Sequence, residues 1–135
     1  MSDKRVLLVE DNAANMTLAT FLLQSAGYEV ISATDAETGV RLARAHCPAL
    51  ILMDIQLPGM DGLQATAHLR ADESTRAIPV VALTALAMKG DEERIRAAGC
   101  DGYIAKPLDY KSFLATVASY FGQDQGGRVP AREEA

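Results

Sequence analysis

The sequence predicts an α/β fold in which five parallel strands form one sheet with helices on both faces. Five short apolar runs, rich in Val, Ile and Leu, alternate along the chain with five longer segments of helical spacing. Such alternation is typical of right-handed βαβ crossovers, which join parallel strands and cover both faces of the sheet with helices.

Each predicted element has its own signal. The predicted strands are the apolar runs 5–9, 28–33, 50–53, 79–83 and 103–105. The predicted helices follow them in order, at 13–26, 36–45, 63–71, 89–98 and 110–121. Gly27, Gly99 and Gly122 stop the first, fourth and fifth helices, Pro48 follows the second, and Asp61 turns the chain into the third.

Length and composition predict a single domain. The chain has 135 residues, of which 49% are hydrophobic and 23% charged, and this is enough to bury a core. We assign the domain to residues 1–122. The polar segment 123–135 contains two glycines and a proline, so we expect a disordered tail with no output domain.

Charge and apolar patterning exclude several classes of protein. Because 18 acidic residues outnumber 13 basic ones, the net charge is −5, and nucleic acid is not expected as a partner. The first apolar run is broken at once by acid, so we expect no membrane span, no signal peptide and a cytoplasmic location. Cys47 and Cys100 lack CxxC spacing and are expected to be reduced thiols.

Polar residues follow four of the five predicted strands. Ligands of open parallel sheets bind outside the carboxyl ends of the strands, so these residues are the candidate site. They are Glu10 and Asp11 after the first strand, Asp54 after the third, Thr84 after the fourth and Lys106 after the fifth. Taken singly, Asp11 and Thr84 also fit as caps and Asp54 as a turn residue.

Taken together, these residues point to a metal-assisted reaction on phosphate. Carboxylates that converge on one sheet edge repel one another, and a hard divalent cation relieves this repulsion. All-oxygen ligands favour hydrated Mg²⁺ over caged Ca²⁺. Asp54 is then a candidate nucleophile toward a phosphoryl group, with Lys106 and the Thr84 hydroxyl as phosphate-binding groups.

Four motifs give the chain a resemblance to a known family. They are VEDN at 9–12, LMDIQLPGMDG at 52–62, ALTA at 82–85 and YIAKP at 103–107. In this order, at the predicted strand ends, they resemble the receiver domain of response regulators over residues 4–121. The resemblance implies a flavodoxin-like (βα)5 sheet with strand order 2-1-3-4-5.

The resemblance also implies a role for each site residue. Asp54 would be the phosphoacceptor, and Mg²⁺ or Mn²⁺ would be bound by Asp54, by Asp11, by Glu10 largely through water, and by the backbone carbonyl of Gln56. The backbone of Ala85 would contact the phosphoryl group and Lys106 would sense it. Thr84 and Tyr103 would form the switch pair, and the Lys106–Pro107 peptide would be cis.

The same resemblance implies partners. The phosphoryl donor would be a phosphohistidine of a histidine kinase or of a histidine phosphotransfer protein. The signal would leave by contact between the fourth helix, fifth strand and fifth helix and a downstream protein, from a monomer or weak homodimer. The runs 81–96 and 10–16 are similar to a single-domain regulator of bacterial cell-cycle control.

The first predicted helix has an apolar arc wider than one core-facing stripe. Leu18 and Phe21 lie on this arc. We interpret them as a docking surface for the helices of a partner, with core packing as the alternative.

Other functions remain as alternatives. A metal-dependent aspartyl phosphohydrolase commonly needs a second carboxylate two residues after the nucleophile, where this chain has Gln56, so we do not expect a dedicated enzyme. A nucleotide or flavin module is disfavoured because loop 10–15 has acids and no glycine. A receiver-like module that binds partners without phosphorylation would not need the complete Asp, Thr and Lys set.

Overall fold

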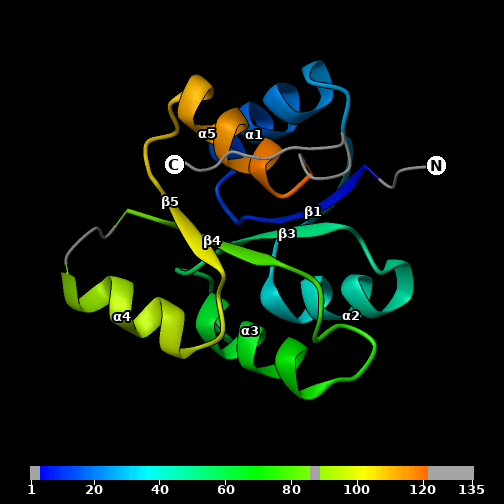
Figure 1. The fold of residues 1–135 in the computed structure, drawn as a ribbon, viewed down its shortest axis with the longest axis vertical. Coiled ribbons are helices and arrows are strands. Elements are labelled where there is room, and N and C mark those ends of the chain that lie inside the picture. Colours follow the sequence, from blue (N-terminus) through cyan, green and yellow to red (C-terminus); the bar gives the residue numbers. More distant parts are fainter. Residues whose placement is uncertain (1–3, 86–88, 122–135) are drawn as a thin grey trace.

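The computed structural model describes residues 4–85 and 89–121, and strands and helices alternate in it as predicted (Figure 1). The strands are β1 (Arg5–Val9), β2 (Glu29–Ala33), β3 (Leu50–Asp54), β4 (Val80–Thr84) and β5 (Gly102–Ala105). The helices are α1 (Ala13–Ser25), α2 (Ala36–His46), α3 (Gly62–Ala71), α4 (Lys89–Ala97) and α5 (Tyr110–Ser119). Every predicted element is present, with small differences at its ends.

The five strands form one parallel sheet in the order β2-β1-β3-β4-β5, which confirms the predicted topology. Leu7 of β1 lies between Ile31 of β2 and Ile51 of β3. On the other side of β3, Asp54 is in register with Leu83. The carboxyl ends of neighbouring strands therefore meet at one edge of the sheet.

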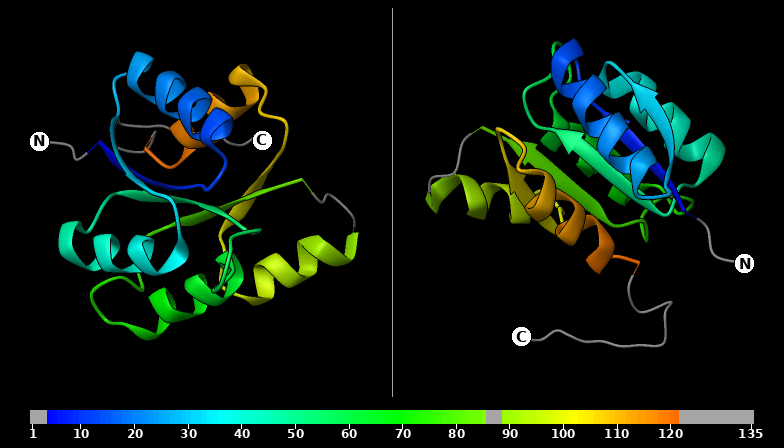
Figure 2. Two further views of the ribbon diagram at one scale, coloured as in Figure 1. Left: turned by 180° about the vertical axis from the view of Figure 1, so that it is seen from behind. Right: turned by 90° about the horizontal axis from the view of Figure 1, so that it is seen from above.

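Helices cover both faces of the sheet, and each face has its own apolar cluster (Figure 2). One cluster joins the sheet to α2, α3 and α4, through side chains such as Val40, Leu69 and Ile95. The other joins the sheet to α1 and α5, through side chains such as Leu23 and Phe113. Since β3 and β4 are buried along their whole length, their sequences are apolar up to their last residues, Asp54 and Thr84.

Local capping fixes where the helices begin and end. Asn12, Asp35, Asp61 and Asp109 each accept a backbone hydrogen bond as the N-cap of α1, α2, α3 and α5. Asp61 also forms a reciprocal capping box with Gln64, which starts α3 at residue 62 instead of the predicted 63.

Left-handed residues end several of the helices. Gly27 and Gly99 have φ values of +95° and +108°, as expected of glycines that terminate α1 and α4. Cys47 ends α2 with a φ of +45°, and no other non-glycine residue among the described ones has a positive φ. Cys47 is exposed and Cys100 is buried, and both are free thiols as predicted.

The predicted tail 123–135 and the helix stop at Gly122 lie outside the described residues. Across residues 4–85 and 89–121, no helix is both long and apolar enough to cross a membrane.

Candidate functional site

Three carboxylates from two strand ends gather at the carboxyl edge of the sheet. One oxygen each from Glu10, Asp11 and Asp54 lies within 4.8 Å of the other two. Glu10 and Asp54 are buried, whereas Asp11 is exposed. The register brings them together because Val9, which precedes Glu10, is paired with Met53, which precedes Asp54.

Lys106 lies between two of these carboxylates. Its Nζ atom is 3.0 Å from Oε1 of Glu10 and 3.1 Å from Oδ2 of Asp54. The Lys106 side chain is only 16% exposed, so both ion pairs are shielded from solvent. The predicted meeting of Glu10, Asp11, Asp54 and Lys106 at one site is therefore seen in the structure.

The environment of Asp54 makes its carboxyl group easier to protonate than a free aspartate in the absence of metal. Burial, followed by the hydrogen bond and charge of Glu10, raises the pKa of Asp54 to about 6, while Lys106 acts in the opposite direction. Burial lowers the pKa of Lys106, but its contacts with Glu10 and Asp54 outweigh burial and raise it. One buried ammonium therefore does not fully offset two buried carboxylates.

The donor set fits a hard divalent cation. All three side chains offer oxygen, which is the ligand type that Mg²⁺ and Mn²⁺ share. Oε1 of Glu10 is buried and makes no directed hydrogen bond within the described residues, although Lys106 Nζ lies 3.0 Å away. Oε1 of Glu10 therefore faces only the Lys106 ammonium, and the Asp11 carboxylate is exposed, so both can also contact a cation.

Backbone amides orient the two buried carboxylates. Asn12 N–H donates to Oε2 of Glu10 at 3.1 Å, and Gln56 N–H donates to Oδ1 of Asp54 at 3.1 Å. Asn12 also caps α1, so the start of this helix is tied to Glu10. Sequence reasoning missed this link, although Asn is a common N-cap residue.

Gly62 of α3 holds the backbone of the candidate nucleophile, which sequence reasoning treated only as part of a turn. Its N–H donates to the Ile55 carbonyl at 2.9 Å. A Cβ atom at this position would overlap the carbonyl oxygen of Asp54 and lie 2.9 Å from Cα of Ile55. Glycine is therefore required for this close approach.

The remaining predicted residues lie around the same edge. Thr84 is buried at the end of β4, Ala85 follows it and is exposed, and the Thr84 carbonyl accepts from Lys106 N–H at 2.8 Å. Tyr103 is partly buried and packs against the cluster beneath α2, α3 and α4. The Lys106–Pro107 peptide is cis, as expected.

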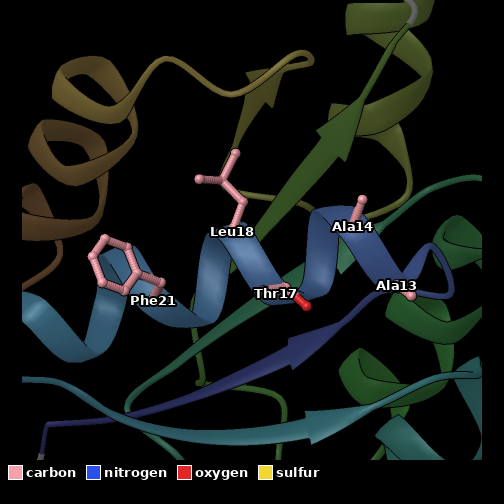
Figure 3. A pocket seen from close by; sticks show the side chains of 5 residues that line it. All are labelled: Ala13, Ala14, Thr17, Leu18 and Phe21. Atoms are coloured by element: carbon pink, nitrogen blue, oxygen red, sulfur yellow. The ribbon is translucent and has the colours of Figure 1, made fainter.

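Leu18 and Phe21 lie on an exposed apolar face of α1. Leu18 is 41% exposed and Phe21 is 66% exposed, so core packing does not account for them. Together with Ala13, Ala14 and Thr17 they line a shallow pocket along the helix (Figure 3). We call this set of five residues the α1 face. Helix α1 carries no charged residue, although the chain as a whole is acidic.

Comparisons with known proteins agree with this geometry. Residues 6–118 match the response regulator receiver domain family. The chain is 52% identical over 119 residues to the polar-differentiation response regulator DivK of Brucella ovis, an alignment that covers 88% of this chain and 97% of the relative. DivK of Brucella anthropi is 51% identical with the same coverage.

Solved structures show the same fold. The receiver domain of the Pseudomonas aeruginosa sensor histidine kinase PA1611, which has a magnesium ion coordinated in its active-site cleft, is 39% identical with a TM-score of 0.82. That comparison covers 88% of this chain and 98% of the other. The Vibrio cholerae chemotaxis protein CheY4 is 25% identical with a TM-score of 0.83, over 88% and 99% of the two chains. The chain belongs to the response regulator receiver domain family.

Proposed function

We propose that this protein is a single-domain response regulator of a phosphorelay that accepts a phosphoryl group on Asp54. One observation carries the proposal: the buried Asp54 carboxylate lies 3.1 Å from Lys106 Nζ and belongs to the only three-carboxylate cluster found among the described residues. The receiver family is shown by the sequence match, and this cluster supports Asp54 as its reactive residue.

The transfer itself needs few protein groups. An oxygen of Asp54 attacks the phosphorus of a phosphohistidine, a P–O bond forms, and the P–N bond breaks. Its electron pair stays on the imidazole nitrogen, which takes up a proton. Lys106 is placed to bind a phosphoryl oxygen, and Thr84 and the backbone of Ala85 follow β4 on the same edge.

We assign the cation site to Glu10, Asp11, Asp54 and the backbone carbonyl of Gln56. When bound there, Mg²⁺ or Mn²⁺ offsets the negative charge of the nucleophile and of the phosphoryl group. The buried Oε1 of Glu10, whose one described partner is the Lys106 ammonium, and the exposed Asp11 support this assignment. The protein is not a dedicated enzyme in this proposal, because it catalyses only its own phosphorylation and its slow reversal.

Phosphoryl labelling with acetyl phosphate and Mg²⁺ tests the proposal. We expect intact-mass analysis to show one added phosphoryl group in the wild type and none in Asp54→Asn. Asp72→Asn is the matched control, since Asp72 is a carboxylate paired with Arg44 outside the acidic cluster. No added mass in the wild type, or equal labelling of Asp54→Asn, contradicts the proposal.

We assign the α1 face to docking of the phosphodonor protein. It begins at Ala13, directly after the Glu10–Asn12 link, so a partner on this face lies beside the phosphoacceptor. Apolar surface flanked by polar residues is typical of protein contact sites. The expected occupant is the helical histidine-bearing domain of a kinase or phosphotransfer protein.

Phe21→Asp separates docking from chemistry. We expect transfer from a phosphorylated histidine phosphotransfer protein to slow by at least about tenfold, since a charge replaces the most exposed large apolar side chain of the face. Labelling by acetyl phosphate should stay unchanged. Ala67→Asp places the same charge on the exposed surface of α3 and should alter neither rate. Equal rates for Phe21→Asp and the wild type with both donors reject docking at this face.

Signal output is proposed to pass through Thr84 and Tyr103 to the surface of α4, β5 and α5. Phosphorylation adds negative charge and acceptor oxygens at the edge where Thr84 lies. Movement of the Thr84 hydroxyl toward these oxygens leaves space into which Tyr103 turns. Thr84→Ala should then abolish the difference in downstream-partner affinity between phosphorylated and unphosphorylated protein, and unchanged coupling rejects this route.

The biological role is proposed from the relatives. The Brucella relatives are named polar-differentiation response regulators, and 97% of the length of one such relative aligns with this chain. On that basis, and on the resemblance of the runs 81–96 and 10–16 to a cell-cycle regulator, we propose a role in bacterial cell-cycle control for this protein. Phosphotransfer profiling against all histidine kinases of the source organism identifies the donor, and a donor outside cell-cycle signalling contradicts the assignment.

A further inference from the structure

Arg70, at the end of α3, ties together three segments that lie far apart in sequence. Its Nε donates to the Gly99 carbonyl at 2.9 Å. Its Nη1 donates to the carbonyls of Arg76 at 2.9 Å and Ile78 at 2.7 Å. Its Nη2 donates to Oδ2 of Asp101 at 2.8 Å. The rigid guanidinium fork thus links α3, the loop before β4, and the turn between α4 and β5.

Asp101 and Gly99 are shaped to receive this arginine. The Asp101 carboxylate also accepts from Val80 N–H at 2.8 Å, and Asp101 N–H donates to the Val80 carbonyl at 2.8 Å. A Cβ atom at Gly99 would lie 2.9 Å from Cγ of Arg70. The Arg70 side chain is 24% exposed, and its bonds to the Gly99 and Ile78 carbonyls are partly buried, whereas those to Asp101 and to the Arg76 carbonyl are exposed. We call Arg70, Asp101 and the Gly99 carbonyl the Arg70 clamp.

The Arg70 clamp lies at the edge of the sheet opposite to the acidic site. Val80 begins β4 and Thr84 ends it, so the clamp is at the amino edge and the site at the carboxyl edge. Because a crossover helix runs antiparallel to its strands, α4 has its carboxyl end at the clamp and its amino end on the side of Thr84 (Figure 1). The carboxyl end of α4 therefore lies beside the Arg70 clamp, and its amino end lies on the side of the sheet that carries the acidic site.

The packing of α4 is concentrated near its carboxyl end. Within residues 90–97, Ile95 is the buried side chain. Four charged side chains pair within the helix: Asp91, whose side chain is 17% exposed, with Arg94 at 3.1 Å, and Glu92 with Arg96 at 3.6 Å. Pairs of this kind join residues of the same helix, so they add little to its attachment to other elements. Among the described residues, Ile95 and the Arg70 clamp thus hold α4 to the rest of the fold.

We propose that the Arg70 clamp fixes the carboxyl end of α4 and confines movement of this helix to its amino end. Arg70 is in this sense a positioning residue, acting on the output helix from outside the phosphorylation site. A rearrangement at Thr84 then moves the amino end of α4 in a swing, while the carboxyl end of the helix stays fixed at the clamp. Phosphorylation as the trigger for this swing rests on the proposed function, whereas the fixing of the carboxyl end of α4 does not.

Amide hydrogen exchange followed residue by residue by NMR tests the clamp without any ligand. The amides to monitor are those of residues 98–101, which donate to the carbonyls of Arg94, Arg96, Ile95 and Val80. In the wild type we expect these amides to exchange more slowly than those of residues 93–94. Arg70→Ala should accelerate exchange at 98–101 by at least about tenfold and leave the amides of β1 unchanged.

Two further variants separate the clamp from a general loss of stability. Arg70→Lys keeps the charge but not the fork, and should give an intermediate acceleration at 98–101. Arg44→Ala removes another arginine–aspartate pair, Arg44 Nε to Asp72 Oδ2 at 2.6 Å, and should leave residues 98–101 unchanged. Uniform acceleration of all slow amides in Arg70→Ala, or no acceleration at 98–101, overturns the proposal.

An activated state tests the swing. With Mg²⁺ and beryllofluoride as the phosphoryl mimic, we expect the α4 changes of the wild type to be confined to residues 90–94. In Arg70→Ala they should extend to 98–101. Changes equal at both ends of α4 in the wild type overturn the swing. Absence of any change around Asp54 counts against the proposed function, while the ligand-free comparison still decides the clamp.

Discussion

At the scale of single residues, the site combines more buried negative charge than its lysine can neutralise. Asp54 and Glu10 both contact Nζ of Lys106, and the pKa of Asp54 is nevertheless raised to about 6. Without metal, the ionised form of this site is therefore destabilised by repulsion between its carboxylates, and a bound cation relieves that repulsion. This electrostatic imbalance favours binding of a cation, which in turn offsets the negative charge of a phosphoryl group.

Metal-free Asp54→Asn is expected to be more stable than the wild type at neutral pH. The pKa of Asp54 is higher in the folded than in the unfolded protein, so ionisation costs stability as pH rises from about 4 to about 6. The gain should be about 1–2 kcal/mol near pH 7 and vanish near pH 4. Urea unfolding in the presence of a chelator measures it at each pH.

Asp72→Asn provides a control of opposite sign. Hydrogen bonds from Ser74 and from Arg44 lower the pKa of Asp72, so its ionised form stabilises the fold. Its replacement should cost stability at neutral pH, and this cost should disappear as the pH falls through the lowered pKa. A loss of stability for Asp54→Asn near neutral pH contradicts the electrostatic account.

At the scale of elements, α3 holds the strand end that carries the nucleophile. Gly62→Ala forces a methyl group against the Asp54 carbonyl, so we expect both lower stability and slower labelling by acetyl phosphate. Gly39→Ala is the matched control, because its Cβ would meet the side chain of Val9, with Cγ2 nearest at 2.7 Å, and no backbone atom. It should cost about 1–3 kcal/mol with unchanged labelling. Equal labelling of both variants contradicts the role of Gly62.

The end of α2 offers a stabilising substitution. Cys47 adopts a left-handed φ of +45°, which glycine accepts without the steric cost that other residues incur. Cys47→Gly should increase the free energy of unfolding by about 0.5–1 kcal/mol, after the larger unfolded-state entropy of glycine is counted. Cys47→Ala removes the same thiol but keeps the strain, so it should bring no gain. Denaturant unfolding of both variants decides the point.

Most elements, and the meeting of the site residues, could be predicted from the sequence because they depend on local signals. Apolar runs, glycine stops such as Gly27 and Gly99, and the position of acids after β1 and β3 are all visible along the chain. The Arg70 clamp and the close approach of Gly62 to Asp54 could not be predicted. They depend on distances between segments that only the folded chain brings together.

At the scale of the whole molecule, metal binding should be linked to folding. We expect Mg²⁺ to stabilise the wild type in proportion to the logarithm of its concentration, by about 2.7 kcal/mol at a hundred times its dissociation constant. Asp11→Asn should remove most of this stabilisation by Mg²⁺. Without metal, the same substitution should change the free energy of unfolding by no more than about 0.5 kcal/mol, because Asp11 is exposed. Thermal unfolding with Mg²⁺, and with sodium chloride of equal ionic strength, measures it.

Glu29→Gln is the control for the loss of one negative charge. Glu29 is exposed at the start of β2, on the edge of the sheet away from the acidic cluster. Its replacement should leave the Mg²⁺ effect intact. Equal loss of the Mg²⁺ effect in Asp11→Asn and Glu29→Gln would mean that the ion acts on overall charge and not at a site.

The strand order leaves β2 and β5 at the two margins of the sheet, where unpaired backbone groups can recruit foreign strands. Both are short: β2 begins with the charged Glu29, and β5 is flanked by Asp101 and Lys106. Ionised flanks of this kind discourage edge-to-edge aggregation. Charged residues at both margins thereby protect the chain from polymerising through its sheet.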